Sequence, residues 1–408
     1  MKNFLLSLLT IGVLGFTTGC SDNENVIPDE DETGEEIKKS GMLTANETWT
    51  ADNIYILDGK VIVSEGITLT IQPGTIIKGG EGLESKASAL VVDQGGKLMA
   101  NGTAAKPIIF TSILDNIEVG QKSGTNLDIE DTGLWGGIIV LGRAPVSLSG
   151  NVQTAQIEGI PANESYGQYG GSTPNDNSGS LKYISIRHGG ITIGQDNEIN
   201  GLTLGGVGSG TVIDHIEIVA NQDDGIEWFG GSVNSSNLVT WAHGDDGFDA
   251  DQAYSGTITN GLVIQTAESG SALELDGPEG SAATEASFTM NNITINGGGA
   301  NGLIADLRDG VLVKLNNVLV YNIGAGAGVK INGADAQKEL VDGRIAFSKW
   351  EIVLPTGVTL GSLLTGATVG SETRFITNAT AIAAKANATI GANTSVFSWT
   401  YAAEKGAI

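Results

Sequence analysis

The chain has 408 residues, of which 60 are Gly and only 8 are Pro, and aromatic residues make up 5 %. This composition argues against long helices, because Gly is a poor helix former, and against collagen, because the Gly residues lack a three-residue period. The formal net charge of −26 argues against nucleic acid as a partner, since Lys and Arg must neutralise its phosphates. An all-β chain with many tight turns remains.

The N-terminus carries a targeting segment. Lys2 precedes an apolar run, Phe4–Phe16, that is too short to span a bilayer, and small residues lead to Cys20, the only Cys of the chain. This pattern resembles a bacterial lipoprotein signal, which predicts a signal peptide over residues 1–19 and lipidation of Cys20. A lone Cys also excludes an internal disulfide and any Cys-based zinc site.

The segment after Cys20 is acidic and contains Pro and Gly. Such a composition cannot bury a core, so residues 20–41 are predicted to be a disordered tether. Acidic residues directly after a lipidated Cys resemble the surface-export signal of Bacteroidota lipoproteins. We therefore expect a lipoprotein of the outer membrane that is exposed on the cell surface.

From Trp49 onward the sequence repeats. Short alternating apolar runs are separated by Gly, Asn and Asp, and Asp214–Trp228 superposes without a gap on Ser236–Ala250, at a distance of 22 residues. Looser copies follow at Asn260–Leu275, Asn291–Leu307 and Asn316–Ile331. A period near 22 to 26 residues with several short strands indicates a solenoid, and neither leucine-rich nor helical periodicity is present. The sequence predicts an all-β, single-domain right-handed parallel β-helix.

The periodicity also predicts the domain organisation. The β-helix is expected over residues 42–333, with loop insertions near 115–131 and 157–180, where the repeat is interrupted. Residues 334–408 are less periodic and are expected to form a C-terminal coil and a cap that folds over the last coil. Asn and Gly at the corners of the coils are expected to take left-handed turns and to stack as ladders.

Three motifs carry a family resemblance. They are TIQPGTIIKG at Thr70–Gly79, GTAAKPIIFTS at Gly102–Ser112 and WGGIIVLGRAP at Trp135–Pro145. Together with Asn197–Gly256, they resemble a family of Bacteroidota cell-surface lipoproteins whose activity is not established. The resemblance implies the pectin-lyase-like fold. The wider superfamily contains pectate lyases and polygalacturonases as well as phage tailspikes and adhesins, so the fold alone does not assign an activity.

The repeat brings acidic residues together. The gapless superposition stacks Asp223 on Asp245, Asp224 on Asp246 and Glu227 on Asp249, and continuation of the same frame stacks Asp251 on Glu274. Equivalent positions on adjacent coils lie about 5 Å apart. Like charges at this distance must share a proton, bind a cation or be well solvated.

Two interpretations of these acids involve no catalysis. Carboxylate oxygens are the ligands that calcium prefers, and the candidate ligands are Asp223, Asp224, Glu227, Asp245, Asp246, Asp249 and Asp251. Alternatively, Asp-Asp-Gly is turn chemistry, in which Asp accepts backbone hydrogen bonds and Gly takes a positive φ. No organic cofactor is expected.

The third interpretation is an enzyme, a polysaccharide lyase or a glycoside hydrolase. Its candidate catalytic residues are Asp223, Asp224, Asp245, Asp246 and Asp249, since a carboxylate pair near 5 Å suits retaining hydrolysis. The pattern of polygalacturonases is not met, because His243 follows Ala242 instead of Gly and no Arg-x-Lys is nearby. Arg187 is the nearest basic candidate for a lyase.

The expected function is that of a surface-anchored lipoprotein that binds a glycan or another ligand through an acidic, calcium-binding lateral face. A net-negative face favours a neutral glycan or one bridged by a cation. The expected partners are the extracellular glycan or another surface ligand, the outer membrane through the lipid anchor, and a TonB-dependent transporter. A polysaccharide enzyme and a purely structural or adhesive surface protein are the alternatives.

Overall fold

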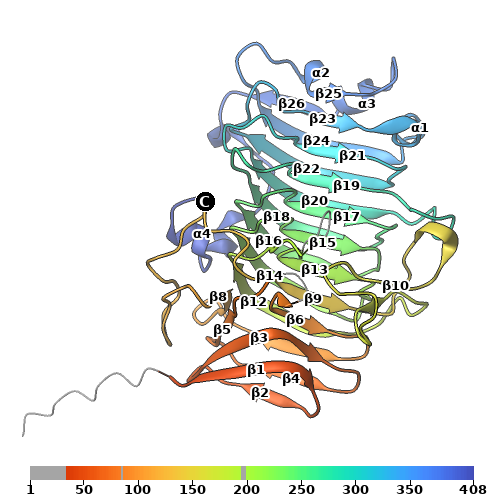
Figure 1. The fold of residues 1–408 in the computed structure, drawn as a ribbon. Helices are drawn as coiled ribbons and strands as arrows, with labels where there is room; N and C mark the ends of the chain where they lie inside the picture. The colour runs from red at the N-terminus through yellow and green to blue at the C-terminus, as the bar shows by residue number, and fades with distance from the viewer. Residues whose placement is uncertain (1–33, 84–85, 194–198) are drawn as a thin grey trace, which may run out of the picture. The chain divides into compact units, whose positions relative to one another are not determined.

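Each short strand of the chain pairs in parallel with the equivalent strand one coil further on. The computed structural model describes residues 34–83, 86–193 and 199–408, and Cys20 with the predicted signal peptide lies outside them. Twenty-four of the 26 described strands form one continuous sheet wound into a right-handed parallel β-helix (Figure 1). This confirms the predicted fold.

One column of strands, here called the site face, receives a single short strand from each coil. These strands are β6 (Ala89–Val92), β9 (Ile138–Leu141), β13 (Leu202–Gly205), β15 (Ile226–Phe229), β17 (Phe248–Asp251), β19 (Leu273–Leu275), β21 (Ala305–Leu307), β23 (Val329–Ile331) and β25 (Leu364–Thr365). The site face therefore runs along almost the whole β-helix.

The other two columns are shared by long strands that bend in the middle. They are β12 (Gly179–Arg187), β14 (Val212–Val219), β16 (Ser235–Trp241), β18 (Thr257–Ile264), β20 (Phe288–Asn296), β22 (Val313–Tyr321) and β24 (Ile345–Val353). Shorter strands build these columns at the two ends, namely β2 (Glu47–Trp49), β4 (Thr68–Ile71), β5 (Ile76–Gly79), β7 (Lys97–Asn101), β8 (Ile108–Ser112) and β26 (Ala379–Ile382). The first coils also contain β1 (Glu36–Leu43) and β3 (Ile54–Val63), which pair with each other.

The bend of each long strand is made by one residue with a left-handed backbone. The residues at this position are Tyr183, His215, Asn237, Asn260, Asn292, Asn317 and Lys349. The Asn260 side chain donates a hydrogen bond to Asn237 Oδ1 at 2.8 Å, and the His215 ring stacks on Tyr183 with centroids 4.1 Å apart. The predicted left-handed turns and Asn ladder are confirmed, and His215 belongs to this stack.

Inward positions of the strands fill the core. Ile226 and Trp228 of β15 and Phe248 and Ala250 of β17 are fully buried, whereas the residues between them point out of the wall. The inward residues are the apolar members of the alternating runs that the sequence shows from Trp49 onward.

The N-terminal boundary differs from the prediction. β1 begins at Glu36 and pairs in parallel with β3 from Ile54 onward, so residues 36–41 belong to the first coil and not to a tether. The acidic composition did not indicate this strand, whose backbone hydrogen bonds are formed with β3.

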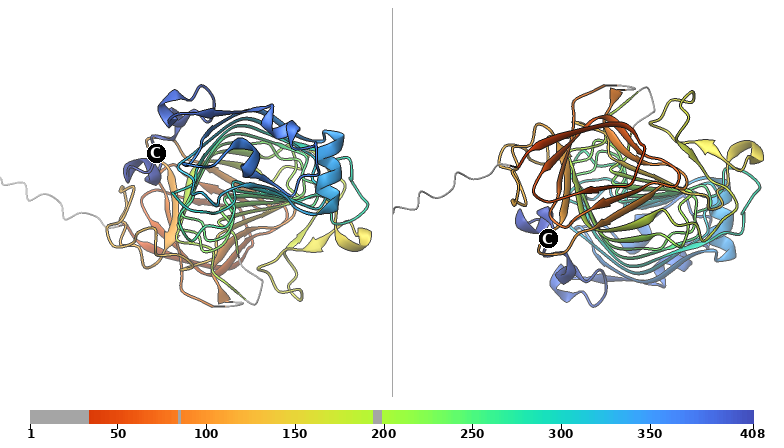
Figure 2. Two further views of the ribbon diagram at one scale, coloured as in Figure 1. Left: turned by 90° about the horizontal axis from the view of Figure 1, so that it is seen from above. Right: turned by 90° about the horizontal axis from the view of Figure 1, so that it is seen from below.

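A long arm leaves the site face after β9. It contains the antiparallel pair β10 (Ala155–Gln156) and β11 (Gln168–Tyr169) and extends to one side of the β-helix (Figures 1 and 2). Tyr166 and Tyr169 of the arm are buried against the site face, in an apolar cluster that includes Phe229. The arm is therefore docked on the site face through these two Tyr.

The α-helices of the described residues are short and lie near the C-terminus. They are α1 (Gly333–Asp342), α2 (Leu360–Leu363), α3 (Thr373–Ile376) and α4 (Tyr401–Glu404). Within the described ranges, none of the helices is both long and apolar enough to cross a membrane.

The last residues, 383–408, form a strap along the outside of the β-helix, on the side opposite the arm (Figures 1 and 2). The strap contacts β24 through Thr389, whose hydroxyl lies 2.6 Å from Glu351 Oε1, and β18 through the Asn393 amide, 2.6 Å from Asn260 Oδ1. It ends in α4 on β14. The C-terminal segment thus covers the middle coils and does more than close the last one, which corrects the predicted cap.

Glu217 of β14 fixes the end of the strap. Its carboxylate is fully buried and accepts hydrogen bonds from the amides of Tyr401 and Ala402 at 3.0 and 2.8 Å and from Ser185 Oγ at 2.6 Å. It also lowers the electrostatic cost of burying the Arg187 guanidinium.

We predict that Glu217→Ala lowers the free energy of unfolding by about 3 kcal/mol, because it leaves buried donors without their acceptor and removes a carboxylate charge that offsets the buried Arg187 charge. Chemical denaturation followed by circular dichroism measures this loss. Asn387→Ala, an exposed change within the strap, serves as the control and should cost less than about 0.5 kcal/mol. Equal stabilities of the two variants would show that Glu217 does not hold the strap.

Candidate functional site

Outward positions of the site face carry a column of acidic side chains. Glu227 of β15, Asp249 of β17, Glu274 of β19 and Asp306 of β21 are parallel partners from one coil to the next. We call these four residues the acid ladder. Lys330 of β23 is the next partner and ends the run of acids. Because parallel strands lie about 4.8 Å apart, four carboxyl groups are held close together by the backbone alone.

The register of the ladder corrects one expectation. Asp249, and not Asp251, is the partner of Glu274. The turn between β18 and β19 comprises residues 265–272 and is two residues longer than the corresponding turn, 242–247, between β16 and β17. The offset of 23 residues between β16 and β18 therefore becomes 25 between β17 and β19.

The acids of the corner before β15 complete the site. Carboxylate oxygens of Asp224, Glu227 and Asp249 lie within 4.8 Å of one another, and all three residues are buried. We call these three the buried carboxylate group. Asp224 also belongs to a second set, with Asp223 and Asp245, that is more exposed and has the same spacing.

Asp246 lies beside the buried carboxylate group and is part of the turn chemistry. Its amide donates to Asp224 Oδ1 at 2.8 Å, and its own Oδ1 accepts from the Ser271 amide. Each Asp thus accepts a backbone hydrogen bond from the next coil. Besides burial, the charge of Glu274 on the next coil opposes ionisation of the Asp246 carboxyl and raises its pKa.

The buried carboxylate group has polar neighbours that do not neutralise it. Asn200 donates to Glu227 and also to Glu158 Oε1, at 3.1 Å, where Glu158 comes from the arm. Asn200 Oδ1 and Asp249 Oδ1 are buried and have no hydrogen-bond partner among the described residues. Both unpartnered atoms are oxygens.

The nearest basic side chain lies further along the site face. Arg308, just after β21, contacts Glu274 at 2.5 Å and Asp276 at 2.8 Å. Arg187, the basic candidate from the sequence, is buried in another column, where it donates to Ser185 Oγ and lies over the Tyr401 ring. Its position beneath the strap does not suit a catalytic base for these acids.

Burial and mutual repulsion favour protons on these carboxyl groups. Burial raises the pKa of Asp224, Glu227 and Asp249 well above the usual range, and neighbouring carboxylates raise each further. Burial, with repulsion from Glu274, raises the pKa of Asp246 to about 8. Burial likewise raises the pKa of Asp251 to about 7. Near neutral pH, this part of the site face must hold protons or a cation.

The donor set fits a hard divalent cation. Three carboxylates and an amide oxygen are buried close together, with acceptor atoms that lack donors, and calcium binds oxygen ligands of this kind. The sequence predicted Asp224, Glu227 and Asp249 as ligands but missed Asn200, Glu158, Asp306 and the pairing of Glu274. Asn200-Gly201 stands directly before β13, and Asp224-Gly225 stands directly before β15. Because β13 and β15 are partners, this pattern in the sequence indicates that Asn200 lies beside Asp224.

Comparison with known proteins identifies the repeat. A family model described as a pectate-lyase-like beta helix domain matches residues 41–403, almost the whole described chain. No curated protein and no solved structure gives a significant match.

We predict that the protein without divalent cations becomes less stable as the pH rises from 5 to 8.5. The raised pKa values mean that the folded state holds protons that the unfolded state, with carboxyl pKa values near 4, has already lost, so stability falls across this window. Thermal unfolding in EDTA should show a melting temperature lower by about 5 °C or more at pH 8.5.

Asp249→Asn separates this effect from general charge repulsion, because it removes one buried ionisable group and keeps its shape. Its melting temperature should depend less on pH between 5 and 8.5. A melting temperature of the wild type that is constant across that range in EDTA would contradict the assignment.

Proposed function

Because the chain belongs to the pectate-lyase-like β-helix family, we propose that its site face binds polysaccharide and that the buried carboxylate group holds a calcium ion that organises this face. One observation carries the proposal. Asp224, Glu227 and Asp249 lie within 4.8 Å of one another and are buried, and no ion pair neutralises them within the described residues.

Calcium supplies the missing positive charge. Its ligands would be the carboxylates of Asp224, Glu227 and Asp249 with the side-chain oxygen of Asn200, whose amide nitrogen already holds Glu227. Since Asn200 also donates to Glu158, a bound ion would fix the arm against the site face. The ion's role in this proposal is to neutralise and stiffen the face.

Polysaccharide would contact the more exposed end of the face. Glu274, Arg308 and Lys330 are only partly buried, with side-chain exposures of 18 %, 36 % and 41 %. Acidic and basic side chains follow one another here at the spacing of the coils. They can form hydrogen bonds with the hydroxyl groups of a polysaccharide, and Arg308 and Lys330 can pair with its carboxylates. A ligand that lies along the coils meets the same pattern repeatedly.

A second candidate is a polysaccharide lyase or glycoside hydrolase that acts at the same acids. The contact of Arg308 with Glu274 favours it, together with the raised pKa of Asp246, because a protonated carboxyl group and a cation then belong to the same site. The spacing of the carboxyl groups is compatible with retaining hydrolysis.

The N-terminal sequence supports anchoring as part of the proposal. Lipidation of Cys20 would attach the β-helix to the outer membrane, with its site face available to extracellular glycan and to a TonB-dependent transporter as partner.

We predict that Asp249→Asn and Glu227→Gln each weaken calcium binding at least tenfold, because each removes one carboxylate ligand. Isothermal titration calorimetry with calcium chloride measures the affinity, and binding to a polysaccharide array with calcium or EDTA measures the consequence. Glycan binding should fall in EDTA and in both variants.

Asp309→Asn is the matched control, since Asp309 is an exposed acid next to Arg308 and outside the buried carboxylate group. It should bind calcium like the wild type. Unchanged calcium affinity in the two ligand variants would refute the calcium site. Release of reducing ends or of unsaturated products from the array polysaccharides would establish the enzyme instead of the binding protein.

For the anchor, we predict that Cys20→Ala abolishes incorporation of labelled fatty acid and moves the protein from the membrane to the soluble fraction, because the acyl chains are the only predicted membrane attachment. Metabolic labelling with fatty acid measures the first effect, and fractionation of expressing cells measures the second. Fatty-acid labelling that persists in Cys20→Ala would overturn the lipoprotein assignment.

A further inference from the structure

The site face has an apolar half, and the arm packs on it (Figure 1). In the first coils the outward residues Ile62, Val91 and Ile139 are parallel partners from coil to coil and are buried. The arm residues that share an apolar cluster with this row are Ile157, Ile160, Tyr166 and Tyr169. The row then continues through Thr203 to Glu227. The site face thus changes from apolar to acidic within two coils, beside the arm.

The base of the arm is fixed by contacts that do not involve the acids of the site. The Glu279 amide donates to the Ser147 carbonyl at 3.2 Å, and the Ser281 amide donates to Asn151 Oδ1 at 2.6 Å. Residues 155–169 of the arm can therefore detach from the site face while the base stays in place.

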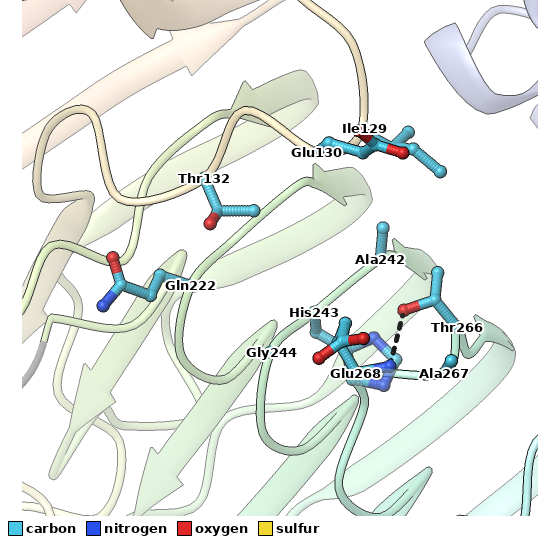
Figure 3. A pocket seen from close by; sticks show the side chains of 10 residues that line it. All are labelled: Ile129, Glu130, Thr132, Gln222, Ala242, His243, Gly244, Thr266, Ala267 and Glu268. Atoms are coloured by element: carbon cyan, nitrogen blue, oxygen red, sulfur yellow. Dashed lines mark hydrogen bonds between the residues drawn. The ribbon is translucent and has the colours of Figure 1, made fainter.

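The corners next to the buried carboxylate group are held by their own hydrogen bonds. The Asp246 amide donates to Asp224 Oδ1 at 2.8 Å, and the Glu268 amide donates to Thr266 Oγ1 at 3.3 Å (Figure 3). These corners and the loop 129–132 border a cavity of about 560 Å³ that no residue of the buried carboxylate group lines (Figure 3). Glu158, in contrast, reaches Asn200 from outside the stacked coils.

Glu158 brings a fourth carboxylate towards the buried carboxylate group. The Asn200 side-chain nitrogen donates both to Glu227 and to Glu158 Oε1, the latter at 3.1 Å. Burial and the Asp249 charge raise the pKa of Glu227, and the Glu158 charge raises it further, so Glu158 and Glu227 repel each other when both are ionised. Docking of the arm therefore costs electrostatic energy when the acids are charged and no cation is present.

A calcium ion would reverse the sign of this interaction. Its two positive charges attract Glu158 as well as the three buried carboxylates. Asn200 Oδ1 is buried and has no hydrogen-bond partner among the described residues. Calcium bound to this oxygen would hold the amide in the orientation that directs its nitrogen at Glu227 and Glu158. The Asn200 side chain would then link the ion to the arm.

We propose that the arm is a calcium-controlled cover of the site face. Calcium in the buried carboxylate group holds residues 155–169 closed over the apolar half, and loss of calcium releases them. Glu158 is the positioning residue that couples the two events. The inference rests on the calcium site proposed above and extends it, because calcium then controls how much of the site face is open to a ligand.

Hydrogen–deuterium exchange followed by mass spectrometry tests the coupling at pH 8.5, where fewer of the acids hold protons. With calcium chloride, the amides of residues 155–169 should exchange about tenfold more slowly than in EDTA. Glu158→Gln should reduce this difference to less than about twofold by slowing exchange in EDTA, because the neutral side chain is not repelled and still accepts from Asn200. Faster exchange of Glu158→Gln in both conditions would show a purely structural role and overturn the proposal.

Glu164→Gln is the matched control. Glu164 is an exposed acid of the same arm, and its charge opposes the fall in the pKa of Lys60 that burial causes. This variant should keep the full calcium response, whatever its exchange rate in EDTA. A response lost equally in Glu164→Gln and Glu158→Gln would contradict a specific role of Glu158.

Calorimetry with calcium chloride separates this inference from the proposed function. Calcium binding without a change in the exchange of residues 155–169 would overturn the cover and leave the calcium site in place. Absence of calcium binding would overturn both. Because coupling between two sites is reciprocal, Glu158→Gln should also weaken calcium binding, and an unchanged affinity would contradict the coupling.

Discussion

Parallel stacking in register is the constraint on which this structure depends. Backbone hydrogen bonds place each outward side chain about 4.8 Å from its counterpart on the next coil, whatever its charge. This repetition is favourable for the apolar inward residues, which pack on one another, and for the Asn residues at the bends, which form hydrogen bonds with one another. It is unfavourable for the acid ladder, because the backbone hydrogen bonds between β15 and β17 hold the Glu227 and Asp249 carboxylates together against their repulsion. Protons or a cation must therefore be part of the folded state, and the chemistry of the site follows from the fold.

Where the repeat has no gap, the sequence alone predicted the contacts. The exact offset of 22 residues between the Asp214 and Ser236 strands is the offset of the structure, and the pairing of Glu227 with Asp249 follows from it. Where a turn changes length the prediction was wrong, because two extra residues after β18 shift the frame and bring Glu274 opposite Asp249. A periodic sequence thus predicts register only between positions with no insertion between them.

Contacts between segments far apart in the chain could not be predicted from periodicity. Glu158 reaches the site from the arm, and the strap covers Arg187 and Glu217 from about two hundred residues away. Neither segment has the alternation of the coils, so no pattern indicates where it docks. The corner sequence Asp-Asp-Gly had two interpretations, a turn and a group of acids. The structure shows that Asp224 takes part in both, because it accepts a backbone hydrogen bond from the next coil and lies beside Glu227 and Asp249.

The strap changes how such a solenoid folds and unfolds. In a simple solenoid each coil contacts only its neighbours, so coils can detach one at a time from either end. Here the amide of Tyr401 is bonded to Glu217, 184 residues earlier, and the segment between them is closed into a loop. Coils inside that loop cannot fray independently until the strap is released. A chain that emerges N-terminus first therefore completes its structure only when its last residues arrive, and a copy truncated near its C-terminus lacks this closure and is exposed to proteolysis.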